Sequence, residues 1–123
     1  MNAATVLVIE EDPHLLDGVR EILELDEYHV LTAGNGGDGL ELTLEYLPDV
    51  IICDVMMPVM NGYEVLEAIR NTPQTQYIPL IFFSAKGGAD IERAKEAGVD
   101  GYIVKPFAAD DLLDMVAAFL SDD

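Results

Sequence analysis

The sequence has 123 residues, half of them hydrophobic, which suffices for one domain with a sizeable core and argues against disorder. Its 24 acidic and 6 basic side chains give a formal net charge of −18, which opposes direct binding to nucleic acid or to anionic membranes and favours cations and basic protein surfaces. A single cysteine, Cys53, excludes a disulfide framework within the chain, and the lack of a signal-peptide pattern or of an apolar stretch of roughly 20 residues predicts a cytoplasmic protein.

Five short runs of residues are predicted to be strands. Four of them are almost continuously apolar, too short for helices and bounded by proline, glycine or charge, which is typical of strands buried on both faces of a parallel sheet. They span residues 6–9, 50–53, 80–83 and 102–104. A more mixed run, residues 28–33, comes second along the chain and fits an edge strand.

Apolar residues at helical spacing follow each predicted strand, so five helices are expected. Asp12 and Pro13 mark the start of the first helix, Asn61 the start of the third and Gly98 the end of the fourth. The apolar stripes are Leu15, Leu16, Val19, Ile22 and Leu23; Leu40, Leu44 and Leu47; Val65, Leu66 and Ile69; Ile91, Ala94 and Ala97; and Leu112, Leu113, Val116, Ala117 and Leu120. The fourth stripe is the least apolar, so that helix should be the loosest. Strictly alternating strands and helices predict a doubly wound α/β fold with a five-stranded parallel sheet and right-handed crossovers.

Polar residues follow every strand that is predicted to be buried. Glu10 and Glu11 follow the first strand, Asp54 the third, Ser84 the fourth and Lys105 the fifth, so they should meet at the carboxyl edge of the sheet, where open α/β sheets bind ligands. Clustered carboxylates are tolerated around Mg²⁺, and a lysine with a hydroxyl suits a phosphoryl group. Because a carboxylate can itself act as a nucleophile, the residues predict Mg²⁺-assisted phosphorylation of Asp54, with Glu10 and Glu11 on the metal.

Four segments of the chain together resemble the receiver domains of two-component response regulators, of the kind found in chemotaxis regulators. They are residues 6–13, 48–62, 78–86 and 97–107, in the right order and at the right spacing. The resemblance covers essentially the whole chain. It implies a single receiver domain over residues 1–123, with five helices and the flavodoxin-like strand order 2-1-3-4-5. Whether the chain is a complete single-domain regulator or part of a longer protein is left open.

The resemblance also implies a role for each acidic residue at the expected site. Asp54 is the phosphoacceptor, which takes a phosphoryl group from a phosphohistidine on a sensor histidine kinase or a phosphotransfer protein. Glu10, Glu11, Asp54 and the backbone carbonyl of Met56 are the implied Mg²⁺ ligands. The domain catalyses only its own phosphorylation and dephosphorylation, and is not expected to be an enzyme.

The remaining implied roles concern the switch. Lys105 pairs with the phosphoryl group, and the peptide between Lys105 and Pro106 is expected to be cis. The hydroxyl of Ser84 turns toward the phosphoryl oxygens, and the rotamer of Tyr102 is coupled to that movement. The output surface for a downstream protein or domain is the face of the fourth helix, fifth strand and fifth helix. The sequence leaves open whether the chain forms a homodimer.

The chain departs from the family pattern at three positions. Glu11 stands where the family usually has aspartate, and its extra methylene alters the geometry that it can offer to Mg²⁺. Met56 and Lys86 lie two residues after Asp54 and Ser84, where the family tunes the access of water to the aspartyl phosphate. Neither is a carboxylate or an amide that would orient a water molecule, so slow autodephosphorylation is expected.

Three other functions are weighed against this one. Gly34, Gly36 and Gly39 fit a dinucleotide-binding pattern, but they follow the second strand, no second nucleotide-binding half exists, and the charge opposes a pyrophosphate. A phosphatase of the aspartyl-phosphate class would want an acid at the position of Met56. The departure at Glu11 keeps a receiver-like binding module that works without phosphorylation as the alternative.

Overall fold

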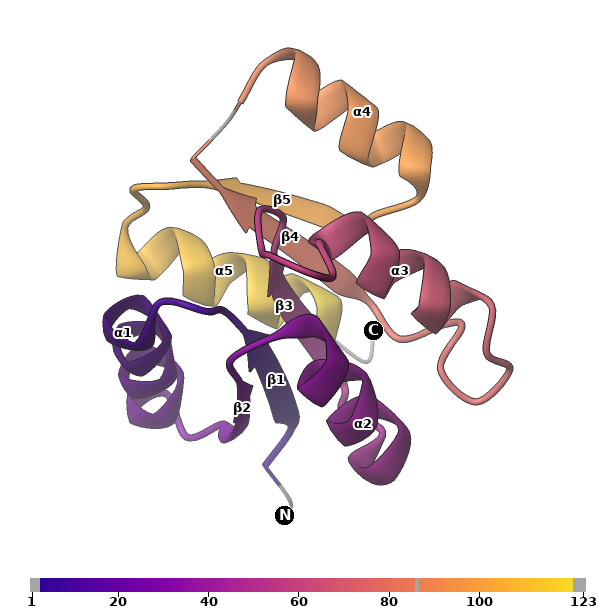
Figure 1. Ribbon diagram of the computed structural model, residues 1–123. Helices are drawn as coiled ribbons and strands as arrows, with labels where there is room; N and C mark the ends of the chain where they lie inside the picture. The colour runs from indigo at the N-terminus through magenta and orange to yellow at the C-terminus, as the bar shows by residue number, and fades with distance from the viewer. Residues whose placement is uncertain (1–2, 86, 121–123) are drawn as a thin grey trace.

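The computed structural model describes residues 3–85 and 87–120. These residues form a five-stranded parallel sheet in the order β2-β1-β3-β4-β5, with helices on both faces (Figure 1). The strands are β1 (Thr5–Ile9), β2 (His29–Ala33), β3 (Val50–Asp54), β4 (Leu80–Ser84) and β5 (Gly101–Val104). The helices are α1 (Pro13–Leu25), α2 (Gly36–Tyr46), α3 (Gly62–Arg70), α4 (Ala89–Ala97) and α5 (Ala109–Leu120). The predicted fold class, strand order and number of helices are confirmed.

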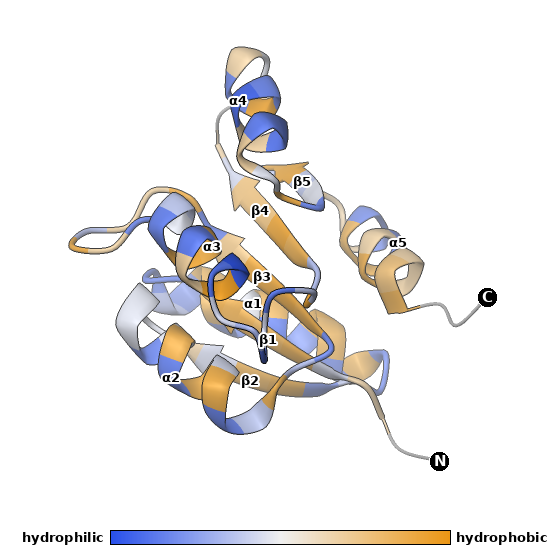
Figure 2. Cartoon of the chain, turned by 90° about the vertical axis from the view of Figure 1, so that its right-hand side faces the viewer, coloured by the Kyte–Doolittle hydropathy of each residue, from blue (hydrophilic) through white to orange (hydrophobic). Residues whose placement is uncertain are grey.

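Consecutive strand residues point to opposite faces of the sheet and supply two separate cores. Leu7, Ile51 and Phe82 belong to the core under α2, α3 and α4, whereas their neighbours along the strands belong to the core under α1 and α5. In Figure 2 the central strands are mostly orange (hydrophobic), and the helices around them carry blue (hydrophilic) residues. Burial on both faces explains why the central strands are almost continuously apolar.

The predicted burial of the fifth strand is wrong in part. Ile103 is buried, but Tyr102 is only half-buried and Val104 is exposed. The reason is the place of β5 at the edge of the sheet, where it pairs only with β4. The second strand, β2, is the opposite edge, as its mixed sequence predicts.

The predicted helix boundaries are confirmed by specific caps. The Asp12 side chain accepts a hydrogen bond from the backbone N–H of His14 at 2.9 Å at the start of α1. Asn61 opens α3 in a capping box with Glu64, and Gly98 closes α4 in the left-handed region. These caps set the directions of the helices that leave the carboxyl edge of the sheet.

The predicted stripe of α2 is wrong in part, because Leu44 and Leu47 are 56% and 50% exposed. Thr43 is buried instead, and α2 approaches β1 through glycine. A Cβ on Gly39 would lie 2.4 Å from Cδ1 of Ile9, so the glycine pattern that resembles a nucleotide loop serves close helix–strand contact.

Helix α4 is attached more loosely than α3. Ala94 is its one buried residue, and its N-cap, Gly88, provides no side-chain hydrogen bond. In α3, by contrast, Val65, Leu66 and Ile69 are all buried. The expectation that the fourth helix is the loosest therefore agrees with its burial.

Candidate functional site

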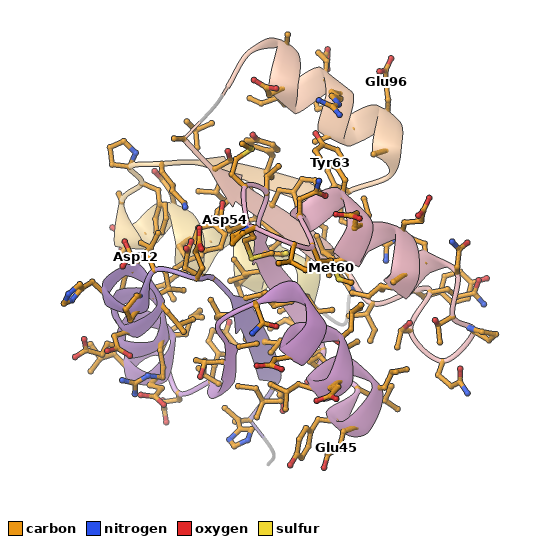
Figure 3. The ribbon with its side chains drawn as sticks, in the orientation of Figure 1. Asp12, Glu45, Asp54, Met60, Tyr63 and Glu96 are labelled. Carbon is orange, nitrogen blue, oxygen red and sulfur yellow. The ribbon has the colours of Figure 1, made fainter. Side chains whose placement is uncertain are left out.

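The predicted site residues come together at the carboxyl edge of the sheet. Asp54 and Ser84 are the last residues of β3 and β4, while Glu10 and Lys105 come directly after β1 and β5. Parallel strands end at the same edge, so four elements that are distant in sequence deliver polar groups to one place. Figure 3 shows Asp54 at this edge, near the start of α1 at Asp12.

The ammonium group of Lys105 lies between two buried carboxylates. Its Nζ is 3.1 Å from Oε1 of Glu10 and 3.5 Å from Oδ1 of Asp54, and the two acidic residues are 2% and 6% exposed. The same Nζ lies 4.6 Å from the centroid of the Phe83 ring. The peptide between Lys105 and Pro106 is cis, as the resemblance implies.

Backbone N–H groups hold the two carboxylates in place. Oε2 of Glu10 accepts a hydrogen bond from the N–H of Asp12 at 2.9 Å, and Oδ1 of Asp54 accepts one from the N–H of Met56 at 3.4 Å. The loops after β1 and β3 thus orient one acid each. Both acids keep an acceptor directed at Lys105.

The electrostatics of the site favour an additional positive charge. Burial, followed by repulsion from Glu10, raises the pKa of the Asp54 carboxyl, while Lys105 and the Met56 N–H offset part of the increase. Two carboxylates therefore share one ammonium group. Carboxylate and carbonyl oxygens are the ligands that Mg²⁺ prefers, so Glu10, Asp54 and the carbonyl of Met56 fit this ion chemically.

The structure does not bring all three predicted acids into one group. Glu11 is exposed, whereas Glu10 and Asp54 are buried beside Lys105. Among residues 3–85 and 87–120, no three His, Cys, Asp or Glu side chains are grouped as metal ligands. The metal role of Glu11 stays a prediction, and Lys86, the second position expected to tune dephosphorylation, lies outside the described residues.

The two predicted switch residues line one cavity next to the acidic site. Ser84 is buried, Tyr102 is half-buried, and the cavity has a volume of about 230 Å³. Its lining comprises Val55, Met56, Asn61, Tyr63, Ser84, Asp90, Arg93 and Tyr102. Neither Tyr63 nor Arg93 is predicted from the sequence as part of a site, because each looks like an ordinary surface residue of an amphipathic helix.

A second and more apolar groove begins at the other side of Lys105. It lies between α1 and the segment that joins β5 to α5, with a volume of about 530 Å³. Its lining residues are His14, Leu15, Gly18, Val19, Ile22, Ala85, Lys105, Pro106 and Phe107. This groove is not predicted from the sequence, since its walls come from three segments that are far apart along the chain.

Cys53 lies next to Asp54 but does not take part in the site. It is buried within β3, and burial, together with the nearby acids Asp54 and Glu10, raises the pKa of its thiol. A thiol that is hard to ionise is a poor nucleophile and a poor metal ligand, so Cys53 serves the packing of the core.

A sheet in this order, with a buried aspartate, a hydroxyl and a lysine at the ends of its strands, is typical of an α/β receiver domain. The family model for the response regulator receiver domain matches residues 6–117. The chain belongs to this family. Receiver domains are signalling switches of two-component systems, which act with histidine kinases and output domains rather than as enzymes on an external substrate.

Three similar proteins illustrate the range of the family. The transcriptional regulatory protein AfsQ1 of Streptomyces coelicolor is 40% identical over 107 residues, which cover 83% of this chain and 44% of that protein. The chemotaxis protein CheY4 of Vibrio cholerae has a TM-score of 0.90 and 30% identity, over 96% of this chain and 99% of that chain. The receiver domain of the sensor histidine kinase PA1611 of Pseudomonas aeruginosa, described with a magnesium ion in its active site cleft, has a TM-score of 0.89 and 23% identity, over 97% and 98% of the two chains.

The chain spans about half the length of curated regulators such as AfsQ1. In the part of the chain that the structure describes, no helix is both long and apolar enough to cross a membrane.

Proposed function

We propose that the chain is a Mg²⁺-dependent phosphoryl switch in which Asp54 accepts the phosphoryl group of a phosphohistidine on a sensor histidine kinase or a phosphotransfer protein. The observation that carries the proposal is the position of Lys105, within 3.5 Å of Asp54 and 3.1 Å of Glu10. A carboxylate oxygen of Asp54 forms the new P–O bond as the P–N bond of the donor breaks. The imidazole nitrogen leaves with the electron pair of that bond.

The proposed metal ligands are Glu10, Asp54 and the backbone carbonyl of Met56, with Glu11 next to them in sequence. When bound, Mg²⁺ supplies positive charge against the phosphoryl oxygens. The support for this assignment is the position of the two buried carboxylates around Lys105, at 3.1 Å for Glu10 and 3.5 Å for Asp54; burial, followed by repulsion from Glu10, also raises the pKa of Asp54. The PA1611 receiver domain, which has the same fold, is described with a magnesium ion in its own active site cleft.

Lys105 and Ser84 act on the phosphoryl group after transfer. Lys105 is the cation that already contacts Asp54, so its ammonium group is placed to pair with the phosphoryl oxygens. The Ser84 hydroxyl donates to the same oxygens, and Tyr102, which lines the same cavity, follows this movement. The changed surface of α4, β5 and α5 then meets the output protein or domain.

The groove between α1 and the segment after β5 is the proposed docking place for the donor. It begins at Lys105, so a helix seated there would carry its phosphohistidine close to Asp54. The net charge of −18 favours a donor whose surface around that helix is basic, and opposes direct contact with nucleic acid or membranes. We infer that residues 1–123 work as a single receiver domain in the cytoplasm.

Intact-mass measurement tests the proposal. The chain is incubated with an acyl phosphate and Mg²⁺, beside Asp54→Asn and a metal-free sample. One added phosphoryl group that requires Mg²⁺ and is absent from Asp54→Asn supports the switch. No adduct on the folded wild type would favour the module that works without phosphorylation, a candidate that the exposed position of Glu11 supports.

A further inference from the structure

A cation–π contact joins α4 to α3 at the cavity beside Ser84. Cζ of Arg93, on α4, lies 4.9 Å from the centroid of the Tyr63 ring, on α3. Both residues line that cavity together with Ser84 and Tyr102. Figure 3 shows Tyr63 in the space between the two helices. The contact therefore bridges the side of the cavity opposite to the sheet.

Aromatic contacts continue from Tyr63 to the switch tyrosine. The rings of Tyr63 and Phe82 meet edge-to-face with centroids 5.1 Å apart, and the rings of Phe82 and Tyr102 do so at 6.4 Å. Phe82 is fully buried in β4 and cannot shift without disturbing the core. Tyr102, Phe82, Tyr63 and Arg93 thus form one continuous row of contacts from β5 to α4.

The contact matters because few of the described side chains of α4 are buried against the rest of the domain. Ala94 is the one buried residue of the helix, and the backbone before it passes through Gly87 and Gly88. The ion pair between Lys95 and Glu92 lies within α4 and does not tie it to another element. The contact of Arg93 with Tyr63 therefore joins α4 to α3 in addition to the burial of Ala94.

We propose that Arg93 is a positioning residue whose guanidinium group, stacked on Tyr63, holds α4 over the cavity beside Ser84 and stabilises the unphosphorylated conformation. The inference rests on the proposed function, because it concerns the response of α4 to a phosphoryl group on Asp54. If Ser84 turns toward that group and Tyr102 follows, α4 readjusts against this contact. A partly exposed cation–π contact corresponds to a shift of about two- to fivefold in the equilibrium between the two conformations.

The test compares four proteins that differ on α4. Arg93→Met removes the guanidinium group and keeps an apolar stem, while Arg93→Lys keeps a cation. Lys95→Met is the matched control, since it makes the same change of charge on the same helix at a side chain that is 68% exposed. The readouts are the initial rate of Mg²⁺-dependent phosphorylation by acetyl phosphate and the backbone amide chemical shifts of α4, before and after phosphorylation.

We expect Arg93→Met to be phosphorylated about two- to fivefold faster than the wild type. Its α4 amide shifts before phosphorylation should move toward those of the phosphorylated wild type, with Arg93→Lys in between and Lys95→Met unchanged. The loss of a positive charge alone would slow the reaction with the anionic acetyl phosphate. A faster rate in Arg93→Met therefore indicates a change in conformation and not an effect of net charge. An unchanged rate and unchanged shifts in Arg93→Met would overturn the inference, and so would equal acceleration in Lys95→Met. Absence of an adduct on the wild type would instead overturn the proposed function, and the inference with it.

Discussion

Replacement of Arg70 by methionine should destabilise the domain more than the loss of any surface ion pair. The guanidinium group at the end of α3 donates to the backbone carbonyls of Ile78 at 2.8 Å and Gln76 at 3.3 Å, and it pairs with the carboxylate of Asp100. That carboxylate in turn accepts from the N–H of Leu80 at 2.8 Å. One side chain therefore connects the loop before β4 to the loop before β5.

The size of the expected loss of stability follows from the hydrogen-bond partners that Arg70→Met leaves without the guanidinium group. Arg70 has a side chain only 26% exposed, so its partners are partly shielded from water. Hydrogen bonds to a charged group contribute about 1.5–3 kcal/mol each when buried, and less where solvent reaches them. Since water can replace some of the lost bonds at the loop, we expect Arg70→Met to lower the free energy of unfolding by about 2–3 kcal/mol.

Urea unfolding monitored by circular dichroism measures this effect, with Arg20→Met as the control. Arg20 pairs with Asp17 and Glu24 on the exposed face of α1, and its replacement makes the same change in net charge. The control should change stability by no more than about 0.5 kcal/mol. Equal losses of unfolding free energy in the two variants would refute the reasoning, because the destabilisation would then come from the change in net charge and not from the hydrogen bonds of Arg70.

Three further predictions concern charge and the lifetime of the phosphoryl group. Because burial and Glu10 raise the pKa of Asp54 in the folded state, its ionised form costs stability above that pKa. Asp54→Asn should therefore unfold at a higher urea concentration than the wild type at pH 7 in metal-free buffer. The difference in stability should shrink as the pH falls through the raised pKa toward the ordinary aspartate pKa. An Asp54→Asn variant that is less stable than the wild type at pH 7 would contradict this prediction. With a net charge of −18, the wild type should gain melting temperature from low to high NaCl, and calorimetry that finds no gain would count against self-repulsion. The Met56 side chain cannot orient a water molecule, so phosphorylated protein freed of donor should keep its phosphoryl group well beyond seconds, as followed by intact mass; decay within seconds rules this out.

Much of the candidate site could be predicted because a parallel sheet brings the ends of its strands together. Glu10, Asp54, Ser84 and Lys105 each follow a buried apolar run, and the order of the strands places them at one edge. The sequence does not reveal the direction of Glu11. It follows buried Glu10 directly and is exposed, because it begins the turn that leads to the Asp12 cap of α1. Periodicity describes strands and helices, but not the turns between them.

The contacts that the sequence could not predict join elements through single side chains. Arg93 meets Tyr63 and Arg70 meets Asp100 across thirty positions of the chain, and no periodic pattern marks either pair. The error on α2 has a related cause. Leucine at helical spacing predicted the buried face, but the close approach of Gly39 to Ile9 sets how the helix lies and turns Leu44 outward.

The charge balance of the site gives a physical reason for the proposed link between the chemistry and α4. Before phosphorylation, the single ammonium group of Lys105 serves both Glu10 and Asp54. A phosphoryl group on Asp54 adds negative charge and acceptor oxygens in a place that is almost closed to water. In the proposed switch, the hydroxyl of Ser84, at the end of the neighbouring strand β4, is expected to donate a hydrogen bond to one of these oxygens. Ser84 lines the same cavity as Tyr63 and Arg93, so we expect such a movement to change the packing on which the proposed position of α4 depends.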